Sequence, residues 1–229
     1  MGEQLVQSWF GIIIDSFAVV VSFAGVATSL GLGVSQIAGG LNHLFGLPQS
    51  KETILWIIII ITSFFLISAI TGVYKGIKLL SNINTYLAII LLIIAFVIGP
   101  KITILNNLVN SIGQHIQYFF SDVLMTNAFG DNSWTMNWRI FYYAWFIAWT
   151  PFVGMFVARI SKGRTIREFI VGVVVIPTIF TIIWLSVFSA IAMTTVSDWS
   201  IDAVKELVKS PETAVFIVFN EWPLSRVIS

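Results

Sequence analysis

The stretch that decides the fold is WRIFYYAWFIAWTPFVGMF, residues 138–156. Nearly half of its side chains are Trp, Tyr or Phe, it contains no Asp or Glu, and Pro151 lies inside it. Six of the rings recur at alternating spacings of four and three residues, which places them on one face of a helix; they are Trp138, Tyr142, Trp145, Trp149, Phe152 and Phe156. The stretch therefore predicts an apolar helix that carries an aromatic stripe.

The composition of the whole chain places this helix in a membrane. Of the 229 residues, 57% are hydrophobic and 10% are charged, and the mean hydropathy is +0.93. A soluble domain carries about 25% charged residues. Several apolar runs reach the roughly 20 residues that cross a bilayer core. We expect an all-α polytopic membrane protein.

The same composition argues against several classes of function. A net charge of +1 without a basic tract gives no electrostatic basis for nucleic-acid binding. The chain has no cysteine, and His43 and His115 lack the neighbouring ligands of a zinc site. An intramembrane enzyme would need a His or carboxylate pair at mid-depth, which the sequence does not provide. We therefore expect no catalytic residues, no metal and no cofactor.

The apolar runs divide the chain, taken as a single partial transmembrane domain over residues 1–229, into expected helices. The glycine-rich segment SLGLGVSQIAGG, residues 29–40, predicts a turn after the first helix, and KGIKLLSN, residues 75–82, predicts a loop before the third. The expected helices cover residues 9–32, 53–74, 83–98, 101–121, 136–159, 167–196 and 214–229.

The helix expected over residues 101–121 differs in kind from the others. Its apolar side chains recur at spacings of three and four, while Asn and Gln fill the opposite face. This amphipathic pattern is typical of a helix that lies along the membrane surface among the lipid headgroups.

The aromatic stripe has three readings. An interfacial aromatic belt explains Trp138, but it does not explain Trp145 and Trp149 near mid-membrane. Packing against neighbouring helices, as in a channel or scaffold protein, is the second reading. The third is a substrate site: Pro151 removes a backbone donor and predicts a break in the helix, and transporters build sites at such breaks. Trp faces bind quaternary ammonium groups, and without nearby acids the stripe favours a zwitterionic one.

Three stretches resemble one transporter family. FYYAWFIAWTPFVGMFVARISKGRTIREF, residues 141–169, is similar to the signature helix and following loop of the betaine/choline/carnitine transporter family. FAGVATSLGLGVSQIAGGLNHLFG (23–46) and LSNINTYLAIILLIIAFVIGP (80–100) resemble it as well. The resemblance implies part of a secondary transporter fold with two inverted five-helix repeats, from about the fifth to the start of the tenth transmembrane helix. It also implies a multi-pass protein of the cell membrane in contact with lipid, and trimers as the family's assembly.

The resemblance also suggests site residues. Trp145 and Trp149 fall on signature tryptophans of the substrate pathway, whereas Phe146 stands where a betaine-type box has Trp. With Tyr142 and Phe156 on the same helix, these are the expected substrate contacts. The substrate stays open among glycine betaine, choline and carnitine.

A coupling-ion site is the second implication of the resemblance. In sodium-coupled relatives it uses hydroxyls one turn apart on the helix matching residues 9–32, facing the signature helix near Phe152. Ser22 keeps a hydroxyl, Val26 lacks one, and Ser29 lies one turn further on. We therefore expect Ser22, Ser29 and Phe152 at the ion site, with sodium, a proton or an exchanged substrate as the driving partner.

The basic residues indicate an orientation. Four cations lie between Arg159 and Arg167, whereas the cations of residues 197–211 are interleaved with acids. The positive-inside rule places the segment around residues 160–166 in the cytoplasm and residues 197–211 outside.

This orientation predicts the outcome of cysteine labelling. Because the chain has no native cysteine, Ser161→Cys and Ser210→Cys each introduce a single thiol. Membrane-impermeant maleimide added to intact cells should label the thiol at position 210, and the thiol at position 161 should react only after permeabilisation. Labelling of both from the same side would contradict the orientation.

Overall fold

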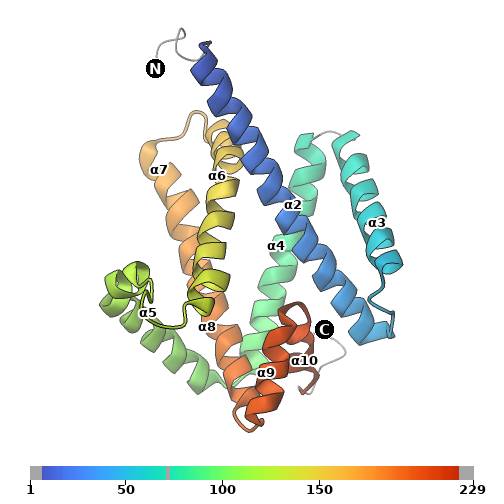
Figure 1. The fold of residues 1–229 in the computed structure, drawn as a ribbon, viewed down its shortest axis with the longest axis vertical. Helices are drawn as coiled ribbons and strands as arrows, with labels where there is room; N and C mark the ends of the chain where they lie inside the picture. The colour runs from blue at the N-terminus through green and yellow to red at the C-terminus, as the bar shows by residue number, and fades with distance from the viewer. Residues whose placement is uncertain (1–6, 71–72, 222–229) are drawn as a thin grey trace. The chain divides into compact units, whose positions relative to one another are not determined.

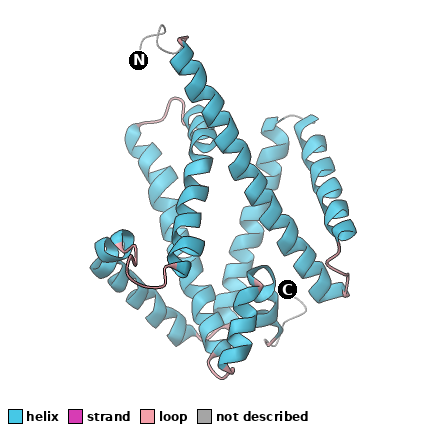
Figure 2. Ribbon diagram, in the orientation of Figure 1, coloured by secondary structure: helices cyan, strands magenta, loops and turns pink. Residues whose placement is uncertain are grey.

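The computed structural model describes residues 7–70 and 73–221, which form helices joined by short loops and no strand (Figure 2). Figure 1 labels the helices along the chain. Their bounds are α2 Trp9–Phe45, α3 Lys51–Ile70, α4 Val73–Ile98, α5 Lys101–Leu124, η1 Thr135–Ile140, α6 Phe141–Ile160, α7 Ile166–Ile170, η2 Val171–Val175, α8 Ile176–Val196, α9 Ile201–Lys209 and α10 Pro211–Asn220.

Among the described residues, five helical segments are long and apolar enough to cross a membrane. Large apolar side chains cover their surfaces; Phe23 and Phe64, for example, are 74% and 68% exposed. Such surfaces are stable against lipid tails and unfavourable in water. The expected fold class, an all-α polytopic membrane protein, is confirmed. The five segments are Trp9–Phe45, Lys51–Ser68, Lys78–Ile98, Thr135–Ile160 and Ile166–Val196.

The contacts divide the chain into two compact units. Unit 1 comprises Met1–Gly31 and Tyr118–Thr178, and unit 2 comprises Leu32–Gln117 and Ile179–Ser229. Unit 1 holds the aromatic helix α6 and the first part of α2. Unit 2 holds the pair α3 and α4, which lie side by side (Figure 1).

The first expected helix does not end at Leu32. α2 continues through the glycine-rich segment to Phe45 and stops at Gly46, whose φ of +68° is the left-handed conformation typical of a helix C-terminus. Two of the internal glycines allow close packing within unit 2: a Cβ on Gly39 or Gly40 would meet Thr213 at 2.9 Å or Phe216 at 2.8 Å. Gly39 and Gly40 therefore serve helix packing, and the turn expected over residues 29–40 is corrected, because the segment is helical.

The third expected helix begins earlier than residue 83. α4 starts at Val73, so the loop expected over residues 75–82 is helical. The segment contains no proline, and Leu79 and Leu80 extend the apolar run of the helix. The second expected helix, over residues 53–74, corresponds to α3, which spans Lys51–Ile70. Residues 71–72 lie outside the described part.

The aromatic helix is not broken at Pro151. α6 runs continuously from Phe141 to Ile160 with Pro151 inside it. One proline removes only one backbone donor, and a membrane helix tolerates this when its other bonds persist. The irregular part comes before α6: η1 is a π-helix in which the Phe141 amide donates to the Met136 carbonyl.

The bounds of the helices after α6 agree more closely with those expected from the sequence. Thr165 and Glu168 form the capping box that begins α7, with each side chain bonded to the other's backbone amide. The helix expected over 167–196 is α7, η2 and α8 in succession. α10 begins at Pro211, before the expected residue 214, and residues 222–229 lie outside the described part.

In unit 2, a polar contact joins the amphipathic helix α5 to α8. The Asn107 amide donates to the Ser186 carbonyl at 3.0 Å and to the Ser189 hydroxyl at 2.9 Å. Next to this contact, Ile104 packs with Ala95 and Ile191 in a buried apolar cluster. The N-terminal half of α5 is therefore held to a membrane-spanning helix, and its placement along the membrane surface stays a prediction.

The Asn107 contact predicts a measurable loss of stability. Asn107→Ala removes both hydrogen bonds and leaves a partly buried hydroxyl and carbonyl without this donor, at a cost of about 1–2 kcal/mol. Thermal unfolding of the purified protein in detergent, followed by circular dichroism, should show a lower midpoint. Asn110→Ala, on an exposed position of the same helix, is the matched control. Equal midpoints for the two variants would contradict the contact.

Candidate functional site

The candidate site lies in unit 1, where α2 and α6 approach each other closely at Gly25. A Cβ on the buried Gly25 of α2 would meet the Cβ of Ala148 at 3.0 Å and the Cδ1 of Trp149 at 3.4 Å. Trp145, Ala148 and Trp149 are half-buried, while the other residues between 141 and 150 are exposed. Gly25 thus lets the two helices approach along the face of α6 that carries both tryptophans.

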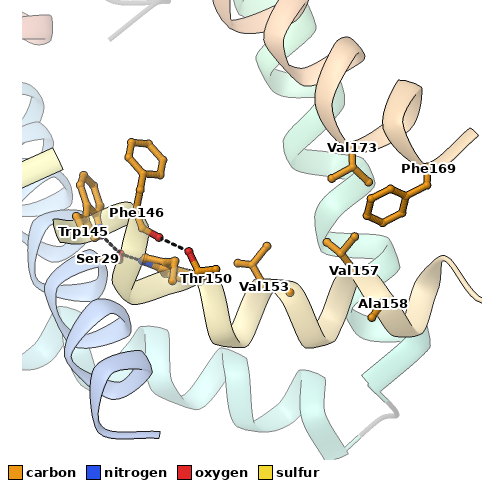
Figure 3. A pocket seen from close by; sticks show the side chains of 11 residues that line it. Ser29, Trp145, Phe146, Thr150, Val153, Val157, Ala158, Phe169 and Val173 are labelled. Carbon is orange, nitrogen blue, oxygen red and sulfur yellow. Dashed lines mark hydrogen bonds between the residues drawn. The ribbon is translucent and has the colours of Figure 1, made fainter. Parts of the chain in front are cut away.

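Ser29 joins the two helices through three hydrogen bonds. Its hydroxyl accepts the indole N–H of Trp145 at 2.8 Å and that of Trp149 at 3.0 Å. The same hydroxyl donates to the carbonyl of Gly25 at 3.0 Å, one turn earlier on α2. Figure 3 shows Ser29 beside Trp145, with the hydrogen bonds drawn as dashed lines.

A pocket of about 700 Å³ opens beside these side chains. Its volume lies within the about 300–1,000 Å³ typical of small-molecule sites. All of its lining residues belong to the described part of the chain, and none of them is acidic or basic. The lining is Ser29, Trp145, Phe146, Trp149, Thr150, Val153, Gly154, Val157, Ala158, Phe169 and Val173 (Figure 3).

The structure brings three of the five expected substrate residues together. Trp145, Phe146 and Trp149 line the pocket. Tyr142 lies one turn away, with its ring 5.6 Å from the Trp145 ring, and lines a second, smaller pocket. Phe156 lines neither of these two pockets. Its assignment as a substrate contact stays a prediction.

The three residues expected at the ion site occupy separate positions along α2 and α6. The Ser29 hydroxyl is engaged by the two indoles, as described above. Phe152 packs edge-to-face on Trp149, with ring centroids 5.9 Å apart. α2 and α6 run antiparallel (Figure 1), and the pairing of Gly25 with Ala148 places the half-buried Ser22, three residues earlier, level with Phe152.

Several lining residues were not expected from the sequence. Phe169 of α7 and Val173 of η2 come from the segment after α6, where apolar residues occur on every face and no periodicity distinguishes them. Thr150 also lines the pocket, and its hydroxyl donates to the Phe146 carbonyl at 3.1 Å. Gly154, three residues after Pro151, provides an open part of the wall, since a Cβ there would meet nothing within 4 Å.

The second pocket, of about 370 Å³, lies at the start of the aromatic helix. Its lining includes Trp138, Tyr142 and Arg139, whose guanidinium lies 5.6 Å from the Trp134 ring centre and donates to the Met125 carbonyl at 2.6 Å. In the exposed loop before it, the backbone amide of Ser133 donates to Asp131 and lowers the pKa of that carboxyl. The hydrogen bond from Arg139 to the Met125 carbonyl connects this loop to the helix.

Comparison with known proteins shows that the whole chain is similar to part of several bacterial transporters. It is 46% identical over 231 residues to the glycine betaine transporter OpuD of Bacillus subtilis, covering 100% of this chain and 44% of that protein. It is 42% identical to the ectoine/glycine betaine/proline transporter EctP of Corynebacterium glutamicum, covering 96% of this chain and 36% of that protein. Identity to glycine betaine transporter 1 of Vibrio parahaemolyticus is 37%, over 96% of this chain and 42% of that protein.

The chain thus spans less than half the length of these relatives. The family comparison extends over every residue of the chain. The sequence model described as "BCCT, betaine/carnitine/choline family transporter" matches residues 1–229, and the chain therefore belongs to this family.

Proposed function

We propose that the protein is a secondary active transporter of quaternary ammonium osmolytes at the cell membrane, with glycine betaine as the favoured substrate. The family is one of transporters and not of enzymes, in agreement with the sequence analysis. The names of the three relatives described above all include glycine betaine. Two of them carry no other substrate in their names, which favours glycine betaine over choline and carnitine.

The observation that carries the proposal is the uncharged pocket beside two indoles. A trimethylammonium group inside a membrane needs electrostatic stabilisation, and its methyl groups offer no N–H donor for a carboxylate to accept. The faces of Trp145 and Trp149 provide stabilisation of up to about 2 kcal/mol each when the group is desolvated. A zwitterion has no net charge, so a pocket without acids or bases does not have to supply a counter-charge when it binds.

The ring at position 146 is expected to contribute less to substrate binding than the two indoles. Phe146 lines the pocket, but it is 69% exposed and phenylalanine is a weaker cation–π partner than tryptophan. Trp145 and Trp149 are therefore the stronger cation–π partners, and their indoles are held by hydrogen bonds to Ser29. This arrangement supports recognition of the compact trimethylammonium group, which glycine betaine, choline and carnitine share.

Removing one indole tests the site. Trp149→Ala in the full-length protein should abolish uptake of labelled glycine betaine, whereas Trp149→Phe should retain a weak remnant because a ring persists. Uptake into cells lacking other betaine transporters gives the measurement, normalised to the amount of protein in the membrane.

Trp138→Ala is the matched control for this experiment. Trp138 stacks on Tyr142 with ring centroids 6.2 Å apart, but it does not line the 700 Å³ pocket. Its loss should reduce uptake much less than the loss of Trp149. Equal losses would favour the alternative function, a channel or scaffold in which the stripe only packs helices.

We propose further that coupling to sodium is weak. At the level of Phe152, α2 offers the Ser22 hydroxyl, but Val26 one turn on has only methyl groups. Sodium requires oxygen ligands, and the Ser29 hydroxyl already accepts two N–H groups. A proton gradient or substrate exchange is therefore the preferred drive.

The coupling proposal predicts a gain of sodium dependence. Val26→Thr adds a hydroxyl one turn from Ser22, so uptake by this variant should respond more steeply to external sodium than uptake by the wild type. Val20→Thr, at an exposed position on the same helix, should leave the response unchanged. A steep sodium dependence of the wild type would contradict the proposal and place the coupling site elsewhere.

A further inference from the structure

Ser29 is the point at which the pocket's two indoles are connected to α2. The N–H groups of Trp145 and Trp149 both end on its hydroxyl oxygen, at 2.8 and 3.0 Å. These residues lie more than a hundred positions from Ser29 along the chain, so the bonds are tertiary contacts. They join the α2 helix to the helix that carries the candidate substrate rings.

The hydrogen-bonding capacity of this hydroxyl is fully used. A serine hydroxyl has one hydrogen to donate and two lone pairs that accept. The hydrogen goes to the Gly25 carbonyl and the lone pairs receive the two indole N–H groups. The bond to Gly25 fixes the rotamer, so the oxygen presents both lone pairs toward α6.

Two bonds to one oxygen restrict both rings at once. An indole has a single N–H donor, and fixing it limits rotation about the two side-chain torsions. Trp145 and Trp149 are one turn apart on α6, which lets both N–H groups converge on one point of the facing helix. The α2 backbone also lies near the Trp149 ring, since a Cβ on Gly25 would be 3.4 Å from its Cδ1.

The neighbouring hydroxyl on α2 shows that this arrangement is specific to position 29. Thr28 also donates to its own helix, to the Ala24 carbonyl at 2.9 Å. Its hydroxyl lines neither of the two pockets described above. Back-bonding within a helix is therefore shared by both residues, whereas the indole bonds are found at Ser29.

We propose that Ser29 is a positioning residue that orients the two tryptophan faces toward the substrate, acting through their indole N–H groups. This inference rests on the proposed function for its consequence in transport. The Ser29 hydroxyl then accepts the two indole N–H groups and is not a ligand of the coupling ion. Without the hydroxyl, the two rings keep their places on α6 but lose their fixed orientation, so substrate binding weakens more than the translocation step.

The first arm of the experiment observes the hydrogen bonds directly. The full-length protein is labelled with ¹⁵N at the indole nitrogens and its N–H resonances are recorded in detergent micelles, with Trp145→Phe and Trp149→Phe identifying the two signals. Ser29→Ala should move both signals upfield, as expected for a lost acceptor, and speed their exchange with solvent. Ser29→Thr, which keeps a hydroxyl, should leave both near their wild-type positions.

The second arm measures glycine betaine uptake. Ser29→Ala should raise KM by about tenfold, the factor expected when hydrogen bonds of ordinary net strength no longer orient the rings. The maximal rate per transporter should change much less, and Ser29→Thr should restore the wild-type KM. Thr28→Val, which removes the neighbouring hydroxyl without changing its shape, should alter neither KM nor the indole signals.

The two arms separate the possible failures. Unmoved indole signals in Ser29→Ala would show that the hydrogen bonds do not form. Moved signals with an unchanged KM would overturn the positioning role, as would a Ser29→Thr variant with restored signals that transports no better than Ser29→Ala. If the wild type neither binds nor transports glycine betaine, the proposed function fails, while the indole signals still decide whether Ser29 holds the rings.

Discussion

An indole N–H inside a bilayer needs an acceptor, because lipid tails offer none and an unpaired donor costs several kcal/mol. In unit 1 this constraint applies to Trp145 and Trp149 together, and one hydroxyl satisfies both. The close approach of α2 and α6 at Gly25 brings Ser29 within reach of the two donors. Helix packing and ring orientation are therefore consequences of the same contact.

The pocket beside this contact is lined by some polar side chains but by no charged one. Its polar groups are hydroxyls and indole N–H groups that are already bonded within the protein, such as Thr150 to the Phe146 carbonyl. What remains for a ligand is a set of ring faces and aliphatic walls. A wall of this kind disfavours a bare ammonium group, which would lose its water without gaining an acceptor. This agrees with the proposed binding of a methylated cation, whose charge is spread over apolar methyl groups.

The sequence was sufficient for the fold class because apolar runs long enough to cross a bilayer have few alternative structures. The errors at the glycine-rich segment and at Pro151 have a common cause. Gly31, Gly33 and Pro151 read as helix breakers by their behaviour in water, but in lipid an unpaired backbone group costs more, so the helix persists through them. Within the site, spacing predicted that Trp145 and Trp149 share a face. It did not predict that Ser29 faces them or that Phe169 and Val173 complete the wall, since these depend on tertiary contacts.

Under the proposals made above, one face of α2 orients the substrate rings and offers few oxygen ligands to a coupling ion. Ser22, Gly25, Val26 and Ser29 follow one another at spacings of three, one and three, so they lie on the same side of the helix. A hydroxyl that accepts two N–H groups has no lone pair left for a cation, so Ser29 can orient the rings or bind an ion, but not both. Ser22, level with Phe152, is the hydroxyl left for an ion, and Val26 adds no oxygen beside it. If both proposals hold, the helix face that orients the substrate rings is a poor sodium site.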